Sequence, residues 1–225
     1  MIGRFLGAAV LAFAAAAPLA HAQTQGALTG TYCLVGVMEV GSCIRLSDGG
    51  RFEYFLAYGA YDEKAEGTWK LENGEVVLDT PAYDRRPTFA YKRTQPGEGD
   101  EFGVIVENKN GRSIAGIDVD VTCDGTTKRA GATQEADFKI DCASAPTAVS
   151  LGLRMFDVAP QTIAVADRAG TNKAYVFEFD PGDLGRKRFV AQRLRRDGGG
   201  ALLMVYANSP ISELEGRTLR YEQSR

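Results

Sequence analysis

The stretch from Phe52 to Tyr58, Phe-Glu-Tyr-Phe-Leu-Ala-Tyr, decides the fold class of this chain. Every second side chain is apolar or aromatic: Phe52, Tyr54, Leu56 and Tyr58. This period of two is typical of a β-strand with one buried face. Asp48-Gly49 precedes the stretch, and such a dipeptide favours a tight hairpin turn because both residues tolerate positive φ angles. The stretch therefore predicts a strand that begins at a hairpin.

The same alternation recurs along the chain in residues 117–121, 149–155 and 175–179. Turn dipeptides punctuate these runs: Asn73-Gly74, Asn110-Gly111, Asp124-Gly125 and Asp197-Gly198. No stretch of helical length carries a helical period, and the one helical turn that we expect, residues 209–216, is a connector with Ser at the N-cap and Gly at the end. The pattern predicts an all-β protein.

A polar segment, Thr94-Gln-Pro-Gly-Glu-Gly-Asp100, has no apolar residue and is rich in residues that break regular structure. We place a domain boundary there. Residues 23–95 are predicted to form an antiparallel meander or small barrel, and residues 96–225 a β-sandwich-like module.

The N-terminus has the three parts of a secretory signal peptide: a basic residue at Arg4, an apolar stretch over residues 5–19, and the small-residue site Ala20-His21-Ala22. The apolar stretch is shorter than the roughly 20 residues that span a membrane. We therefore assign residues 1–22 to the signal peptide and expect a periplasmic or secreted protein that does not span the membrane after cleavage.

Charge and histidine content exclude many functions. The chain carries 26 Lys plus Arg against 29 Asp plus Glu, without the basic excess that phosphate neutralisation needs, so we expect no nucleic-acid partner. Its single histidine, His21, lies inside the predicted signal peptide. A mature protein without imidazole lacks the base of Ser-His-Asp and Cys-His catalysis and the commonest transition-metal ligand. We expect no catalysis, no cofactor and no metal site.

Four cysteines remain, at positions 33, 43, 123 and 142, and an even count in an exported chain indicates disulfides. Four cysteines allow three pairings. Each consecutive pair brackets a short segment with turn signals, so we predict Cys33–Cys43 and Cys123–Cys142, with a stabilising role.

Two segments carry a family resemblance. Gly30-Thr-Tyr32, Leu46-Ser-Asp-Gly49, Phe52-Glu-Tyr54 and Gly67-Thr-Trp69 resemble the meander of lipocalin-like envelope β-modules. Residues 104–140, with Gly131-Ala-Thr133 and Phe138, are similar to the opening of carboxypeptidase regulatory-like, prealbumin-like sandwiches, although Ala136 stands where those have Gly. The resemblance implies accessory or binding modules of uncharacterised bacterial periplasmic proteins, and it transfers no functional residue.

Six cations flank the expected short strand 189–192 and are the one candidate ligand site: Arg186, Lys187, Arg188, Arg193, Arg195 and Arg196. If this strand pairs with residues 201–206 across a turn at 195–200, the cations meet at the two ends of one hairpin. They then form either a solvated edge that discourages aggregation or an anion-binding patch for lipid phosphates or acidic glycans.

Other chemical patterns are weak. Asp118, Asp120 and Asp124 form either a solvated face or an irregular cation site, because an EF-hand alignment puts Gly131 where a Glu ligand is needed. An aromatic run ends in the expected acidic loop 62–66. We predict a non-catalytic periplasmic binding protein whose partner is an anionic envelope component or another periplasmic protein. The alternatives are a lipocalin-like carrier of a small apolar ligand and, less favoured, a carboxylate-based hydrolase.

Overall fold

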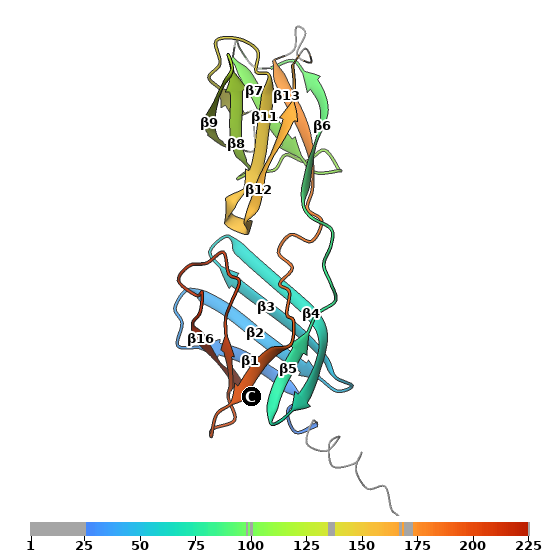
Figure 1. Ribbon diagram of the computed structural model, residues 1–225, viewed down its shortest axis with the longest axis vertical. Coiled ribbons are helices and arrows are strands. Elements are labelled where there is room, and N and C mark those ends of the chain that lie inside the picture. The colour runs from blue at the N-terminus through green and yellow to red at the C-terminus, as the bar shows by residue number, and fades with distance from the viewer. Residues whose placement is uncertain are drawn as a thin grey trace, which may run out of the picture.

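A computed structural model describes residues 26–97, 99, 101–134, 138–166, 168 and 173–224. The predicted signal peptide and Ala136 lie outside the described residues. Within them the chain is all-β, as predicted, with two β bodies stacked along one long axis (Figure 1). The lower body in Figure 1 is a barrel and the upper one a sandwich.

The barrel consists of eight antiparallel strands closed in the order β1-β16-β15-β14-β5-β4-β3-β2. Five come from the N-terminal part: β1 Gly30–Val35, β2 Val40–Ser47, β3 Arg51–Tyr58, β4 Tyr61–Glu72 and β5 Glu75–Asp79. Three come from the C-terminal end: β14 Gln192–Arg196, β15 Leu202–Val205 and β16 Thr218–Gln223. The C-terminal strands thus fill the gap between the two edges of the N-terminal meander.

The sandwich is inserted between β5 and β14. One sheet has the order β10-β7-β13-β6 and the other β12-β11-β8-β9. The strands are β6 Thr88–Gln95, β7 Phe102–Glu107, β8 Asp118–Cys123, β9 Thr126–Ala132, β10 Phe138–Ile140, β11 Ala148–Leu153, β12 Val158–Ala164 and β13 Ala174–Asp180. A 3-10 turn, η1 Arg154–Phe156, lies at the end nearest the barrel.

The boundary predicted at residues 95 and 96 is wrong. Thr94 and Gln95 are the last residues of β6, β7 of the same sheet begins at Phe102, and residues 192–223 belong to the barrel. Five meander strands leave unpaired backbone groups at β1 and β5, and β16 and β14 pair with these edges. The real connections are the two linkers at residues 80–87 and 181–191.

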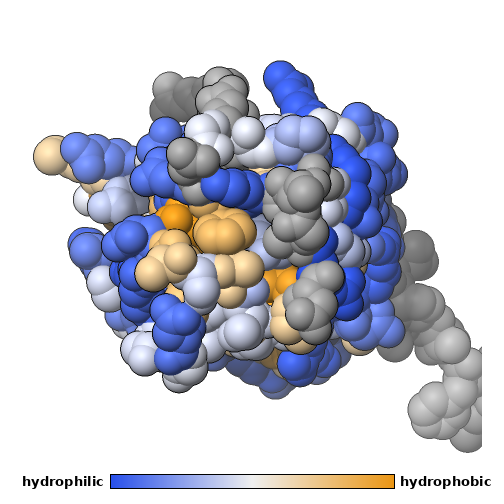
Figure 2. All heavy atoms as spheres, turned by 90° about the horizontal axis from the view of Figure 1, so that it is seen from above, coloured by the Kyte–Doolittle hydropathy of each residue, from blue (hydrophilic) through white to orange (hydrophobic). Residues whose placement is uncertain are grey.

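The predicted alternation holds in the strands that form the cores. Phe52, Tyr54 and Leu56 of β3 are buried in the barrel, while Phe55 is 48% exposed on its outer face. In the sandwich the inward residues of β8, β11 and β13 form a second core. Met155 is the exception, because it lies in η1 after β11 ends and is exposed. Hydrophobic side chains also appear at the far end of the sandwich, bordered by hydrophilic ones (Figure 2).

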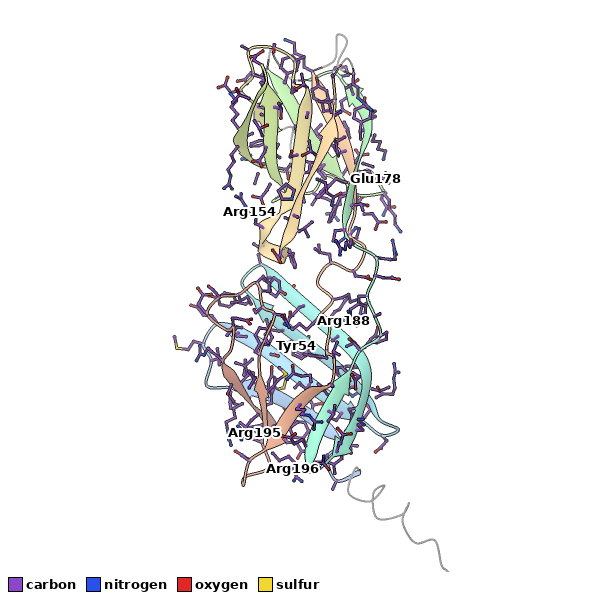
Figure 3. The ribbon with its side chains drawn as sticks, in the orientation of Figure 1. Tyr54, Arg154, Glu178, Arg188, Arg195 and Arg196 are labelled. Atoms are coloured by element: carbon purple, nitrogen blue, oxygen red, sulfur yellow. A yellow bond between two sulfur atoms is a disulfide. The ribbon has the colours of Figure 1, made fainter. Side chains whose placement is uncertain are left out.

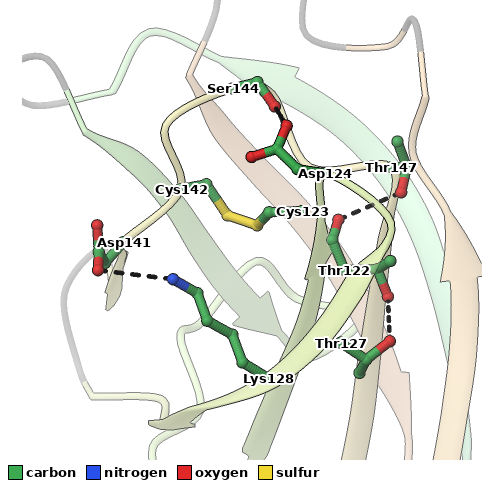
Figure 4. The surroundings of a disulfide bond; sticks show 9 residues. All are labelled: Thr122, Cys123, Asp124, Thr127, Lys128, Asp141, Cys142, Ser144 and Thr147. Atoms are coloured by element: carbon green, nitrogen blue, oxygen red, sulfur yellow. Dashed lines mark hydrogen bonds and ion pairs between the residues drawn. A yellow bond between two sulfur atoms is a disulfide. The ribbon is translucent and has the colours of Figure 1, made fainter.

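Both predicted disulfides are confirmed. Cys33 and Cys43 face each other on β1 and β2. Cys123, at the end of β8, is joined to Cys142, which follows β10 (Figure 4). A Ser144 hydroxyl that donates to Asp124 at 2.6 Å lies beside this second disulfide. The two covalent links thus hold one hairpin of the barrel and one corner of the sandwich.

Candidate functional site

The two linkers run together between the barrel and the sandwich. Near the barrel, the Thr80 amide donates to the Phe189 carbonyl at 3.0 Å. Near the sandwich, the Asp183 amide donates to the Arg85 carbonyl at 2.7 Å, and the Arg85 amide donates to the Asp183 carboxylate at 2.6 Å. Gly182 has a φ of 49°, and a Cβ there would collide with the Arg85 carbonyl, so this crossing requires glycine. Hydrogen bonds near both bodies therefore hold the two linkers together.

Between the two bodies lies a cleft of about 1430 Å³. The barrel contributes Tyr61, Glu63, Gln192 and the loop 207–210, and the sandwich contributes Thr88, Arg154 and residues 156–161. The linkers contribute Arg86, Pro87, 183–188 and Val190. Clefts between domains are common ligand sites because two rigid bodies bring different chemical groups to one space. This cleft is the candidate site.

A buried carboxylate forms part of its barrel wall. Glu63 is 4% exposed, and its oxygens accept hydrogen bonds from three tyrosine hydroxyls. Tyr54 and Tyr206 donate to Oε1 at 2.7 and 2.5 Å, and Tyr61 donates to Oε2 at 2.8 Å. A charge-assisted bond to a buried carboxylate is stronger than a neutral one, and several of them offset the cost of burying the charge. We call Glu63 and these three tyrosines the carboxylate cluster.

Burial raises the pKa of each tyrosine in the carboxylate cluster, and the negative charge of Glu63 raises it further. The three hydroxyls therefore keep their protons at any physiological pH and act as hydrogen-bond donors. The polar chain continues into the barrel, where the hydroxyls of Tyr221 and Ser42 lie 3.1 Å apart and the Ser42 hydroxyl donates to the Phe55 carbonyl. Burial likewise raises the pKa of Tyr221 to about 12.

Lys187 lies beside the carboxylate cluster, on the linker that returns to the barrel. Its Nζ donates to the carbonyls of Ala207 and Asn208 at 2.7 and 3.0 Å and is 3.9 Å from Glu63 Oε2. The same nitrogen lies 4.1 Å from the centre of the Tyr206 ring. Its side chain is 7% exposed, and this burial lowers the pKa of Lys187, against the opposing effect of Glu63 and Glu215.

Positive charge exceeds negative charge around the cleft. The basic residues that line it are Arg86, Arg154, Arg186, Lys187 and Arg188, and the acidic ones are Glu63, Asp157 and Asp183. Arg154 is paired with Asp118, and Arg186 with Glu66 at 3.3 Å. Within the described part of the chain, Arg86 and Arg188 have no carboxylate in ion-pair range, and both side chains are exposed. These two guanidinium groups are available to an anion.

The six predicted cations do not form one site. Arg186, Lys187 and Arg188 line the cleft, whereas Arg195 and Arg196 lie at the opposite end of the barrel (Figure 3). Arg193 is occupied by Glu72 at 2.8 Å and Glu75 at 3.1 Å. The predicted hairpin exists as β14 and β15, but its first strand begins at Gln192, because Phe189 turns inward and packs against Tyr54 in the barrel core.

Two of the three aspartates singled out in the sequence, Asp118 and Asp124, form hydrogen bonds within the sandwich. Asp118 accepts hydrogen bonds from Arg154 and Arg129, and Asp124 accepts one from Ser144. Across the described residues, no three His, Cys, Asp or Glu side chains are grouped as metal ligands would be.

Sequence reasoning missed Glu63. The predicted acidic loop 62–66 is wrong, since these residues lie within β4, where Tyr61, Glu63, Ala65 and Trp69 alternate inward. A glutamate in phase with aromatic residues was the signal that could have identified it. Lys187 was part of the predicted cationic group, but its burial was not foreseen.

No protein-family model, curated protein or solved structure matches this chain. In the described ranges, no helix has the length and apolar content to cross a membrane.

Proposed function

We propose that this chain is a non-catalytic binding protein of the cell envelope, periplasmic or secreted, that holds an anionic envelope component in the cleft between its two bodies. The observation that carries the proposal is the cleft itself, with the guanidinium groups of Arg86 and Arg188 left without carboxylate partners among the described residues. Arginine suits such a site because its planar group holds carboxylate or phosphate in two-point contacts.

The size of the cleft bears on the ligand. Its volume of about 1430 Å³ exceeds the range of roughly 300–1,000 Å³ typical of small-molecule pockets. Pro87, Val158, Leu184 and Val190 add apolar surface between the charges. A segment of an anionic chain molecule fits this mixture better than a single small ion does.

Two observations support the proposed location. The two disulfides are typical of proteins that mature in an oxidising compartment. The pattern of residues 1–22 is that of an export signal.

The alternative of a lipocalin-like carrier finds little support in the barrel. Its interior is filled by a cluster of buried side chains, among them Phe52, Leu56, Tyr206 and Tyr221. Two members of the carboxylate cluster, Tyr61 and Glu63, place a hydroxyl and a charge on the side of the barrel that lines the cleft. Glu63 is also surrounded by tyrosine donors, an arrangement that suits a structural carboxylate better than a hydrolytic one.

Binding assays with two anionic probes test the proposal: oligogalacturonate, which carries carboxylates, and phosphatidylglycerol vesicles, which carry phosphates. We expect retention of at least one probe at low salt, and loss of retention as salt screens the charges. The double variant Arg86→Glu/Arg188→Glu should lose it.

The matched control is Arg195→Glu/Arg196→Glu, which makes the same charge change at the far end of the barrel and should bind as the wild type does. Equal loss in both variants would point to a general charge effect and contradict a site in the cleft. No retention of either probe at low salt would overturn the proposal.

A further inference from the structure

Lys187 is a buried amine on the wall of a ligand-sized cleft, and the proposed anion site does not use it. Its Nζ has two hydrogen-bond acceptors at normal distance, the carbonyls of Ala207 and Asn208. Glu63 is 3.9 Å away, beyond hydrogen-bond length. A charged ammonium has three N–H donors and a neutral amine has two, so the two carbonyls satisfy the neutral form completely.

The surroundings of Lys187 act on the charge of its amine in opposite directions. Both oxygens of Glu63 already accept hydrogen bonds from tyrosine hydroxyls, which stabilise the carboxylate without help from a lysine. The linker places the side chain where burial disfavours its charge, although Glu63, Glu215 and the Tyr206 ring favour it. A desolvated lysine with a free lone pair is the usual nucleophile for carbonyl compounds.

We propose that Lys187 Nζ captures the ligand of the cleft reversibly, by forming an imine with an aldehyde or ketone group on an anionic molecule. The proposal rests on the proposed function, because the anionic part is held by Arg188 and Arg86 while the carbonyl part reaches Lys187. All three residues line the same cleft, and Lys187 and Arg188 are consecutive in the chain.

The chemistry balances without any oxidant or reductant. The Nζ lone pair attacks the carbonyl carbon, and the carbonyl π electrons pass to oxygen, which becomes a hydroxyl. The two protons of the amine end on that oxygen, transferred through the solvent of the open cleft. The oxygen departs as water while the nitrogen lone pair completes the C=N bond.

Reductive trapping tests this step. The protein, with its export segment removed, is incubated at pH 7 with glyoxylate and cyanoborohydride, and each lysine is quantified by peptide mass mapping. We expect Lys187 to be modified at least several-fold faster than Lys70 and Lys128, because burial lowers the pKa of the Lys187 amine and the cleft brings glyoxylate to it. The side chains of those two lysines are 59% and 47% exposed, against 7% for Lys187. Burial alone would give the opposite order, so labelling of Lys187 slower than the exposed lysines overturns the proposal.

Two variants and a second probe distinguish anion binding by the arginines from imine formation at Lys187. Lys187→Arg keeps a cation and should remove the fast label, with circular dichroism confirming that the barrel still folds. Arg188→Glu should slow labelling of Lys187 by glyoxylate and leave labelling by the neutral probe acetaldehyde unchanged. If acetaldehyde labels Lys187 rapidly but no anion binds, the proposed function fails and the reactive amine stands. If anions bind and neither aldehyde labels Lys187 rapidly, only the imine is lost.

Discussion

The ring of Phe156 in the sandwich lies 5.0 Å from the ring of Tyr61 in the barrel, at an interplanar angle of 33°. Phe156 packs against the cores of both bodies, and the Tyr61 hydroxyl donates to Glu63. One tyrosine therefore connects the contact between the two bodies to the carboxylate cluster on the wall of the cleft.

Replacing Phe156 with alanine should loosen this contact. The ring is half-buried, so we expect a loss of about 1–2 kcal/mol in the free energy of unfolding, less than for a fully buried phenylalanine. Small-angle scattering should show a broader range of distances between barrel and sandwich. Met155→Ala is the matched control, because the neighbouring side chain is 51% exposed and its removal should change stability by less than about 0.5 kcal/mol. An unchanged scattering profile for Phe156→Ala would show that the two hydrogen-bonded linkers alone fix how the barrel and the sandwich are placed relative to each other.

Replacing Glu63 with glutamine should destabilise the barrel by about 3 kcal/mol in urea unfolding, since three hydroxyl donors lose their charged acceptor inside the protein. The control is Glu53→Gln, which removes a carboxylate from an exposed ion pair with Arg45 and should cost less than about 1 kcal/mol. Similar losses in the two variants would mean that the carboxylate cluster contributes no more than a surface pair.

The N-terminal meander could be predicted because its signals are local. Large apolar and aromatic residues recur at every second position of residues 52–58, and the turn dipeptides Asp48-Gly49 and Asn73-Gly74 mark two hairpins of the meander. The closing strands could not be paired in the same way, since β14 meets β5 only after the whole sandwich has intervened. Pairing across such a distance depends on which edges remain open in the folded barrel, and no short stretch of sequence records it.

The candidate site, too, could be predicted from the sequence only in part. Alternation correctly predicted that Tyr54 faces inward, but a period of two does not say which hydroxyls meet across a barrel. Tyr206 reaches Glu63 from the other end of the chain. Composition misled the interpretation of residues 62–66, where three acidic residues suggested a loop although their inward neighbours continued the strand pattern.

Acid should weaken the sandwich through Glu107. This buried carboxylate lies 2.9 Å from an Arg93 guanidinium nitrogen and 2.7 Å from Lys92 Nζ, and the hydrogen bonds from Arg93, followed by those from Lys92, lower the pKa of Glu107 below its ordinary value of 4.5. A lowered pKa means that the folded state binds fewer protons than the unfolded state. The stabilisation is therefore complete above pH 4.5 and is lost as pH falls through the lower, folded value.

Melting temperatures of wild type and Glu107→Gln, measured from pH 7 down to pH 2, check this sign. The wild type should melt higher at pH 7, and the gap should close in the acid range, where the protonated carboxyl resembles the amide. The control is Glu101→Gln, which changes an exposed glutamate and should melt close to the wild type at pH 7. A gap for Glu107→Gln that stays constant would assign the effect to packing rather than to charge.

Arg193 should matter for closure of the barrel, in contrast to Arg195 on the same outer face. Its guanidinium bonds to Glu72 of β4 and Glu75 of β5, and thus bridges the seam where the C-terminal strand β14 joins the N-terminal meander. Arg193→Glu would place a third carboxylate beside these two, and we expect a lower urea midpoint than that of the wild type because of the lost pairs and the new repulsion. Arg195→Glu makes the same charge change without a paired carboxylate in the described structure, so stability should stay within about 0.5 kcal/mol of wild type. Equal stability of the two variants would show that backbone pairing of β5 with β14 holds the seam without the arginine.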